Sequence, residues 1–324
     1  SALRVVERHS FRNLVSLLTL YLNDNSIRII EEEAFAGLEN LKNLLLDHNK
    51  IRFLDFHLFS GFYLLKTLRM KANQLEKLNI NNSEINVINL DLSENRLDSI
   101  DDFNPESLKK LKVLDLNLNN LTSFGLKRRI TINGSKLFKN IINMDELKIN
   151  NNSLMLIGDD DWFSFERFQK IKILDLSANQ IRKDESTNSY QIQLADLKEL
   201  NELNLNYLEL TSFDRLSIES YLRSDQLKIE KLFLKNNQIK SIENVTFVGL
   251  DHLRYISFES NQIGSLSRVI LNGIKNLQTL VLRNNLIETL EQCHFEGFSN
   301  ISELFIEHNK IRQVDNIHFL NPLN

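Results

Sequence analysis

The sequence predicts an α/β solenoid, in which a concave parallel β-sheet faces an irregular convex side. Three observations predict it: an apolar template that recurs twelve times, an asparagine at one fixed position of that template, and a most common spacing of 24 residues. The 324 residues are 42% hydrophobic and 25% charged, with a formal net charge of -4. This composition excludes a chain that is disordered throughout.

The template is L-x-x-L-x-L-x-x-N-x-L, and its apolar positions are apolar in every match. The matches begin at Leu17, Leu41, Leu65, Val87, Leu111, Met144, Ile171, Leu200, Ile229, Leu253, Leu277 and Ile301. The L-x-L core alternates with a period of two, so we expect each repeat to form a short strand with its leucines on one face. Parallel stacking of these strands requires a crossover in every repeat.

Asparagine occupies its template position in eleven of the twelve repeats, at Asn25, Asn49, Asn73, Asn95, Asn119, Asn152, Asn179, Asn237, Asn261, Asn285 and Asn309. Its side chain can hydrogen-bond the backbone of its own and adjacent turns, so we expect a structural ladder that satisfies buried polar groups. Leu208 stands at this position in the remaining repeat. We expect a distorted turn there, or a water molecule or neighbouring side chain in place of the amide, because an unmet buried polar group costs about 1–3 kcal/mol.

Phenylalanines recur in the second half of the 24-residue repeats. Six of them are expected to stack as a spine beneath the convex side: Phe11, Phe35, Phe59, Phe247, Phe295 and Phe319. The middle of the chain, 122–228, departs from the regular spacing and is predicted to carry loops on the sides of the coil. We expect residues 1–324 to form a single solenoid. We also expect them to be an excerpt of a longer protein, because the chain starts and stops within the repeat and has no capping segments at its ends.

The template resembles that of the leucine-rich-repeat proteins from about Leu3 to Leu323, which implies a horseshoe fold. The 24-residue spacing with its phenylalanine is similar to the extracellular "typical" subclass, found in Toll-like receptors, chaoptin-like adhesion proteins and insect immune proteins. The resemblance implies a non-enzymatic protein-recognition module: the ectodomain of a receptor, adhesion protein or secreted immune protein, located outside the cell or at its surface. The implied partner is a protein ligand or co-receptor, and a homo- or heterodimer is compatible with this.

The alternative is a cytosolic leucine-rich-repeat scaffold or regulatory subunit. A single cysteine, Cys293, and the absence of cysteine-rich caps support this alternative. The 24-residue repeats with their phenylalanines oppose it, because cytosolic family members more often use shorter or longer repeats. If the chain is secreted, the sequons at Asn133, Asn244 and Asn81 are the expected glycosylation sites.

Side chains between the core leucines line up in columns on the concave face. In the last four repeats we expect Phe233, Val281 and Phe305 of one column and Tyr255 of the column two residues earlier to lie on a face exposed to water. Beside it runs an alternating charge row whose neighbours can pair across strands: Lys235, Glu259, Arg283 and Glu307. Aromatic side chains rimmed by charges resemble a protein-binding hot spot, so these eight residues are predicted to bind a partner. Tyr21 and Leu45, near Asp24 and Asp47, form a smaller candidate.

No catalytic, metal-binding or cofactor-binding motif emerges from the sequence. The seven histidines form no H-E-x-x-H pattern. We interpret Asp91, Asp115 and Asp175 as part of the L-D-L sequence that recurs in the expected strands, and not as catalytic residues. We interpret Lys127–Arg129 and Asp159–Asp161 as solvated loop charges, because the latter lack the alternating ligand spacing of a calcium loop. The mildly acidic balance gives no reason to expect nucleic acid as a partner, and no apolar run is long enough to span a membrane.

Overall fold

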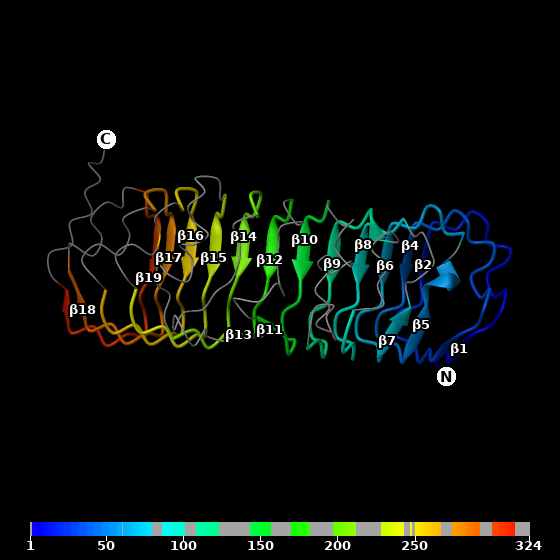
Figure 1. The fold of residues 1–324 in the computed structure, drawn as a ribbon, viewed down its shortest axis with the longest axis horizontal. Helices are drawn as coiled ribbons and strands as arrows, with labels where there is room; N and C mark the ends of the chain where they lie inside the picture. The colour runs from blue at the N-terminus through cyan, green and yellow to red at the C-terminus, as the bar shows by residue number, and fades with distance from the viewer. Residues whose placement is uncertain are drawn as a thin grey trace, which may run out of the picture. The chain divides into compact units, whose positions relative to one another are not determined.

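The computed structural model describes residues 2–59, 61–79, 86–100, 108–122, 143–156, 170–181, 197–211, 228–242, 247, 250–266, 274–291 and 300–314. The chain divides into two compact units, unit 1 (Ser1–Leu154) and unit 2 (Met155–Asn324). Each unit is a coil of parallel strands, so the predicted parallel solenoid is confirmed (Figure 1).

Unit 1 places six strands in one parallel sheet, in the order of the sequence: β2 (Thr19–Tyr21), β4 (Asn43–Leu45), β6 (Thr67–Arg69), β8 (Asn89–Asp91), β9 (Val113–Asp115) and β10 (Glu146–Lys148). Leu20, Leu44 and Leu68 stand opposite one another, so the repeats are in register. Further along each coil lie two smaller parallel pairs, β1 (Val5–Val6) with β3 (Ile29–Ile30) and β5 (Phe53–Asp55) with β7 (Lys77–Asn79). The 3-10 helix η1 (Phe56–Phe59) follows β5.

Unit 2 repeats this arrangement with β12 (Ile173–Asp175), β14 (Glu202–Asn204), β15 (Lys231–Phe233), β16 (Tyr255–Ser257), β17 (Thr279–Val281) and β19 (Glu303–Phe305). Its small pairs are β11 (Met155–Leu156) with β13 (Gln180–Ile181) and β18 (Thr289–Leu290) with β20 (Gln313–Val314). Every strand of the larger sheets begins two residues after the start of a template match, so its middle residue is a core leucine or isoleucine.

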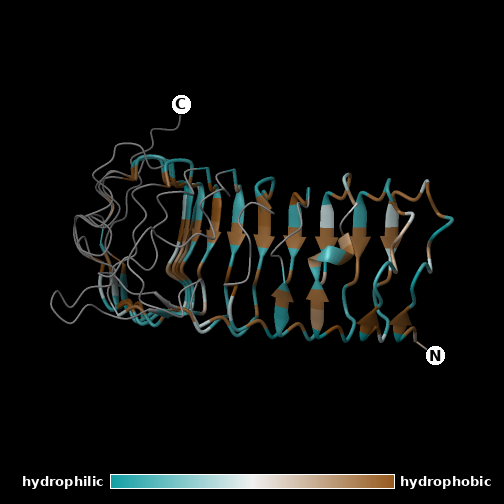
Figure 2. Cartoon of the chain, turned by 45° about the vertical axis from the view of Figure 1, so that its right-hand side comes forward, coloured by the Kyte–Doolittle hydropathy of each residue, from teal (hydrophilic) through white to brown (hydrophobic). Residues whose placement is uncertain are grey.

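The inward apolar positions form the core of each unit. Leu44, Leu114, Leu203 and Leu280 are all at most 2% exposed, whereas the residues on either side of the first three are partly exposed. Figure 2 shows the resulting mixture of hydrophobic and hydrophilic residues along the strands. This alternation follows from the period of two in an extended chain, and it leaves the outer face of each sheet available to solvent or to a partner.

Phenylalanine rings stack in the second half of the first repeats. The ring centroids of Phe11 and Phe35 are 6.0 Å apart, and those of Phe35 and Phe59 are 6.3 Å apart, with the planes tilted by only 12° and 20°. In unit 2, Phe247 is fully buried and meets Phe258 edge-on at 6.2 Å. Phe295 and Phe319 lie outside the described residues.

The asparagine ladder is made of the same four kinds of hydrogen bond in repeat after repeat. The amide nitrogen Nδ2 of Asn49 donates to the carbonyl oxygens of Leu22 (2.9 Å), Leu46 (2.9 Å) and Asp47 (3.2 Å). Its Oδ1 accepts the backbone N–H of Ile27 at 2.9 Å. Each such amide therefore joins its own turn to the preceding one and satisfies backbone groups that water cannot reach.

Leu208 interrupts this ladder, and the next asparagine compensates for it in part. Oδ1 of Asn237 accepts two backbone N–H groups, from Leu210 at 3.1 Å and from Leu208 itself at 3.0 Å. The turn also contains a second residue with a positive φ, Glu209 at 58°, in addition to Tyr207 at 56°. The sequence predicted either a distorted turn, or a water molecule or neighbouring side chain in place of the amide. The second positive φ is such a distortion, whereas Asn237 adds only an acceptor for the N–H of Leu208 to the bonds typical of the ladder.

Two glycines with positive φ provide a test of how tightly the coil is packed. A Cβ on Gly37 (φ 88°) would lie 2.4 Å from the carbonyl oxygen of Arg12, whereas one on Gly61 (φ 100°) would meet nothing within 4 Å. We expect Gly37→Ala to lower the free energy of unfolding by about 2 kcal/mol, from backbone strain and steric conflict together. Gly61→Ala, the matched control, should cost only the strain of about 1 kcal/mol. Urea denaturation measures both, and equal losses would contradict the close approach to Arg12.

Candidate partner-binding surface

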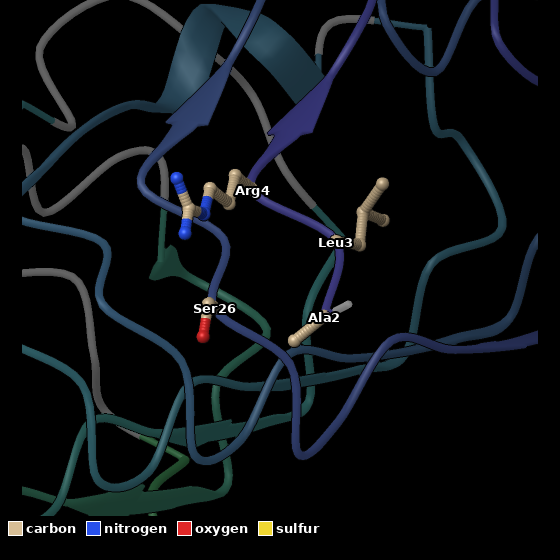
Figure 3. Close-up of a pocket in the computed structure, with 4 residues that line it drawn as sticks. All are labelled: Ala2, Leu3, Arg4 and Ser26. Carbon is tan, nitrogen blue, oxygen red and sulfur yellow. The ribbon is translucent and has the colours of Figure 1, made fainter.

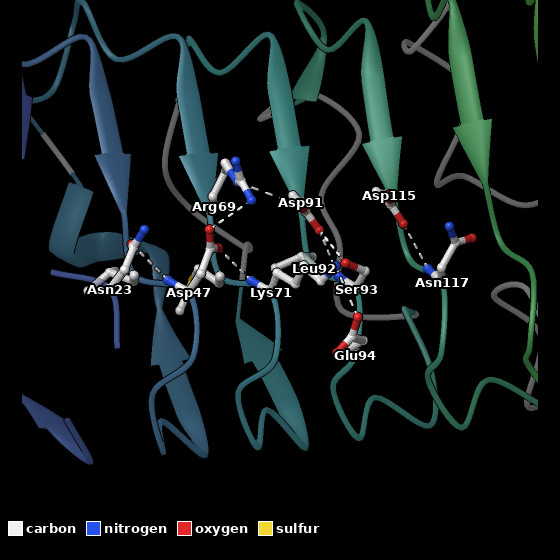
Figure 4. Close-up of polar contacts among 12 residues, drawn as sticks. Asn23, Asp47, Arg69, Lys71, Asp91, Leu92, Ser93, Glu94, Asp115 and Asn117 are labelled. Atoms are coloured by element: carbon white, nitrogen blue, oxygen red, sulfur yellow. Dashed lines mark hydrogen bonds and ion pairs between the residues drawn. The ribbon is translucent and has the colours of Figure 1, made fainter. Parts of the chain in front are cut away.

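The outer face of the unit 1 sheet carries a group of charged side chains, here called the charged face. It comprises Asp47, Arg69, Lys71, Asp91, Glu94, Asp115, Glu146 and Lys148. Figure 4 shows its central part, with Arg69 between Asp47 and Asp91 and with Asp115 one strand further along. The strands determine these positions, because successive residues of a strand point to opposite faces of the sheet, so that residues next to the core leucines lie on the outer face.

Asp47 is the most deeply buried carboxylate of the charged face. Its side chain is 4% exposed, and its Oδ2 is 2.9 Å from Nη2 of Arg69. Its Oδ1 accepts the backbone N–H of Lys71 at 3.0 Å. Burial raises the pKa of the Asp47 carboxyl, and the nearby Arg69 guanidinium and the Lys71 N–H oppose that rise. Asp47 thus has a structural role that its sequence position did not reveal.

Asp91 and Asp115 stand opposite one another on β8 and β9 but have different surroundings. The Oδ1 of Asp91 accepts both the N–H (3.0 Å) and the hydroxyl (2.6 Å) of Ser93, and its Oδ2 lies 3.8 Å from Nε of Arg69. From the described residues, Asp115 accepts the N–H of Asn117 alone, at 3.0 Å. Burial, strengthened by the charge of Asp91, raises the pKa of the Asp115 carboxyl to about 6.

The outer face of the unit 2 sheet presents a different surface, here called the aromatic face: Phe233, Tyr255 and Phe305 with the charge row Lys235, Glu259, Arg283 and Glu307. The rings of Phe233 and Tyr255 lie 5.1 Å apart on neighbouring strands. The guanidinium of Arg283 lies over the Phe305 ring, 5.7 Å from its centroid. All three aromatic side chains are half-buried, so each keeps part of its ring at the surface.

The charge row of the aromatic face pairs across strands. Glu259 is 2.9 Å from Nζ of Lys235 and 3.0 Å from Nη2 of Arg283, and Nη1 of Arg283 is 3.5 Å from Glu307. Burial opposes ionisation of Glu259, but the hydrogen bonds from Lys235 and Arg283 outweigh it and hold the pKa of the Glu259 carboxyl below its usual range. The row is therefore a fixed rim rather than a set of free charges.

Val281 does not contribute to this surface as predicted. It lies in the expected column between Ser257 and Phe305, but it is only 3% exposed, as is Ser257. A phenylalanine ring extends further from the sheet than a valine side chain, and strands lie about 4.8 Å apart, so a small residue beside a large one is recessed. Val281 is a buried support of the face, not a contact residue.

The smaller predicted site at the start of unit 1 is only partly open. Tyr21 is 70% exposed and stands opposite Leu45, which is half-buried. Asp24 is exposed, whereas Asp47 is buried against Arg69. The two residues therefore offer one exposed ring beside a half-buried leucine, and of the two nearby carboxylates only Asp24 is open to solvent.

Comparisons with known protein families agree with this geometry. The profile described as "Leucine rich repeat" matches residues 1–51, 228–287, 259–311 and 275–322, and the one described as "BspA type Leucine rich repeat region (6 copies)" matches residues 116–228. Together these matches include most of the chain. The chain belongs to the leucine-rich-repeat family.

Solved leucine-rich-repeat structures share the fold at low sequence identity. A protein of Leptospira interrogans has a TM-score of 0.68 at 21% identity, with 97% of this chain and 81% of that chain covered. The APL1 leucine-rich repeat domain has a TM-score of 0.67 at 21% identity, with 98% and 76% covered. Toll, in its Drosophila complex with Spatzle, has a TM-score of 0.63 at 20% identity, but this chain covers only 38% of it. At such identities the likeness establishes the fold alone.

Other candidate features of this leucine-rich-repeat protein fall outside the described residues. These are the sequons at Asn81, Asn133 and Asn244, the cysteine Cys293, and the loop charges Lys127–Arg129 and Asp159–Asp161. Among the residues that are described, no group of three or more histidine, cysteine or acidic side chains could hold a metal ion. Within the same part of the chain, no helix is long and apolar enough to cross a membrane.

An open hollow lies at the first repeat, lined by Ala2, Leu3, Arg4 and Ser26 (Figure 3). The N–H of Ser26 donates to the carbonyl oxygen of Leu3 at 2.9 Å, which joins the two segments that line it. Arg4 is the one charged side chain of the four lining residues, and none of them is a carboxylate, histidine or thiol. The hollow therefore lacks the convergent acid and base groups that catalysis requires.

Proposed function

We propose that this leucine-rich-repeat protein is a non-enzymatic recognition module that binds a protein partner on the outer face of its sheets. The observation that carries the proposal is the aromatic face of unit 2. It combines three partly exposed rings, Phe233, Tyr255 and Phe305, with a paired charge row. Protein-binding hot spots favour this composition, because rings supply apolar area at low entropic cost and surrounding polar groups exclude water.

We further propose that the module belongs to the ectodomain of a receptor, adhesion protein or secreted immune protein. Support comes from the 24-residue repeats with their phenylalanines and from the structural likeness to Toll. The Toll structure contains a protein ligand, Spatzle, and is described as a hub in development and innate immunity. The proposed site of action is outside the cell or at its surface, and the partner is a protein ligand or co-receptor.

Replacing Phe233 and Phe305 together by serine is expected to weaken partner binding at least tenfold, because two of the three ring contacts of the face are lost. The immobilised protein and the double variant would first be used side by side to capture proteins from the source tissue. A candidate enriched on the unmodified protein would then be purified, and its dissociation constant would be measured for both forms by surface plasmon resonance.

The matched control is the double variant Phe53→Ser with Tyr63→Ser. These rings are 62% and 73% exposed and belong to unit 1, whereas the aromatic face belongs to unit 2. This control should bind the purified partner as tightly as the unmodified protein, and thermal melting should show that all three proteins are folded. Equal affinity of the unmodified protein and the Phe233/Phe305 variant would refute the aromatic face as the contact.

The proposed location has a separate test. Full-length protein produced from its own coding sequence in animal cells should appear in the medium or at the cell surface and should lose mass on treatment with peptide N-glycosidase F. Mass spectrometry of the deamidated peptides would then identify which sequons carried glycans. Protein retained in the cytosol without a mass shift would favour the scaffold alternative.

A further inference from the structure

The charges of the charged face do not balance locally. Its three cations each hold a carboxylate: Arg69 pairs with Asp47 at 2.9 Å, Lys71 with Glu94 at 3.0 Å, and Lys148 with Glu146 at 3.0 Å. The charged face has five carboxylates for these three cations. Oδ2 of Asp91 lies 3.8 Å from Nε of Arg69, which already pairs with Asp47. Asp115 is left with no cation at ion-pair distance among the described residues.

The surroundings of Asp115 are poor in hydrogen-bond donors. Among the residues that the structure describes, the half-buried carboxylate accepts a hydrogen bond from the N–H of Asn117 alone. Two residues after β10, the N–H of Asn150 donates to Oδ1 of Asn117 at 2.8 Å, while the side-chain Oδ1 of Asn150 is buried without a donor from the described part of the chain. Two acceptors on adjacent repeats, the Asp115 carboxylate and Oδ1 of Asn150, thus have fewer donors from the described residues than buried oxygens normally have.

We propose that Asp115 and Asp91 receive a cationic side chain, arginine or lysine, from a protein partner that docks on the charged face. The inference rests on the proposed recognition function and names the chemistry of the partner. Such a side chain carries only donors, so it supplies both the charge and the hydrogen bonds missing at Asp115. Leu118, 48% exposed and three residues beyond Asp115, offers apolar surface for the aliphatic stem of the ligand side chain.

The energetics of Asp115 agree with this role. Burial and the facing carboxylate of Asp91 on β8 raise the pKa of Asp115 to about 6, and the charges of Lys148 on β10 and Lys71 after β6 only partly offset them. The ionised form is therefore destabilised in the protein alone, and a cationic side chain from a partner would relieve that destabilisation. Binding should accordingly be stronger above pH 6, where Asp115 is ionised, than at pH 5.

The test uses the full chain and a fluorescein-labelled peptide, Gly-Ser-Arg-Ser-Arg-Ser-Gly. Its control replaces both arginines by citrulline, which has the same shape without the charge. Fluorescence anisotropy at low ionic strength should show binding of the arginine peptide at least tenfold tighter than that of the citrulline peptide. Asp115→Asn should weaken arginine-peptide binding about tenfold at pH 7.5 and abolish most of the difference between pH 7.5 and pH 5.

Asp175→Asn is the matched variant. Asp175 occupies the same template position in unit 2, but its Oδ1 accepts both the N–H and the hydroxyl of Ser177. It should bind the arginine peptide like the unmodified protein. Equal affinity of Asp115→Asn and the unmodified protein, an equal loss in Asp175→Asn, or no preference for arginine over citrulline would each overturn the inference.

A variant of the aromatic face distinguishes a failure of this inference from a failure of the proposed function. The Phe233→Ser/Phe305→Ser variant should keep its affinity for the arginine peptide, because none of its changes touches the charged face. If the purified partner binds through the aromatic face while the peptide does not bind at all, the recognition function stands and the assignment of a cationic ligand fails.

Discussion

Replacing Asn237 by alanine is expected to lower the free energy of unfolding by about 3–5 kcal/mol. Its Nδ2 donates to the carbonyl oxygens of Leu205 (3.0 Å), Leu234 (3.0 Å) and Lys235 (3.5 Å), and its Oδ1 accepts from Leu208 and Leu210. Alanine would leave these backbone groups without partners in the interior, and the preceding turn has no asparagine of its own to replace them.

Asn309→Ala is the appropriate control for this prediction. Asn309 makes the same kinds of bond, to Leu282, Ile306 and Ile287, but it is only partly buried, so water can replace the lost amide. We expect a loss of about 1–2 kcal/mol there. Urea denaturation followed by circular dichroism gives both values. Equal losses of unfolding free energy at the two positions would show that the missing asparagine at position 208 does not make Asn237 more important for stability.

Asp115→Asn is expected to stabilise the protein by up to about 3 kcal/mol at pH 7.5, because it removes a destabilised charge. The pKa of the folded-state carboxyl is raised from 3.8 to about 6. The folded state therefore binds this proton more tightly than the unfolded state. The stabilising contribution of the protonated carboxyl is complete below about pH 4 and is lost as the pH rises through 6.

The difference in stability between Asp115→Asn and the unmodified protein should therefore depend on pH. It should be small at pH 4, increase between pH 4 and pH 6.5, and remain constant at higher pH. Urea denaturation at half-unit intervals of pH measures this difference directly, and groups common to both proteins cancel. A difference that is constant across the range would contradict the raised pKa, and a loss of stability at pH 7.5 would show that the carboxylate is needed for folding.

The template alone was sufficient to predict the solenoid, because the core leucines, the L-x-L strands and the ladder asparagines each have one physical role. All twelve matches supply a strand of a larger sheet. Leu208 was also identified correctly as the weak turn. The hydrogen bonding of this turn, in which the amide oxygen of Asn237 accepts two N–H groups, accompanies the positive φ of Glu209 and could not be predicted from the sequence.

The surfaces were less predictable, because pairing depends on how far side chains reach between strands. The sequence ordered the charge row correctly, and its charges do pair, but it did not show that Val281 is recessed. It also gave Asp91, Asp115 and Asp175 the same L-D-L pattern. Their environments differ because a serine follows two residues after the first and the last, whereas Asn117 follows Asp115 and offers only its N–H.

The residue before each ladder position has a left-handed backbone in every repeat, and none of these residues is glycine: Asp24, His48, Ala72, Glu94, Leu118, Asn151, Ala178, Tyr207, Asn236, Ser260, Asn284 and His308. None of them is buried. Acidic, basic, aromatic, aliphatic and amide side chains all occur there, so the coil tolerates chemical variety at a conformationally demanding point. The bend of the main chain is imposed by its neighbours, which leaves this edge free to diversify without rebuilding the scaffold.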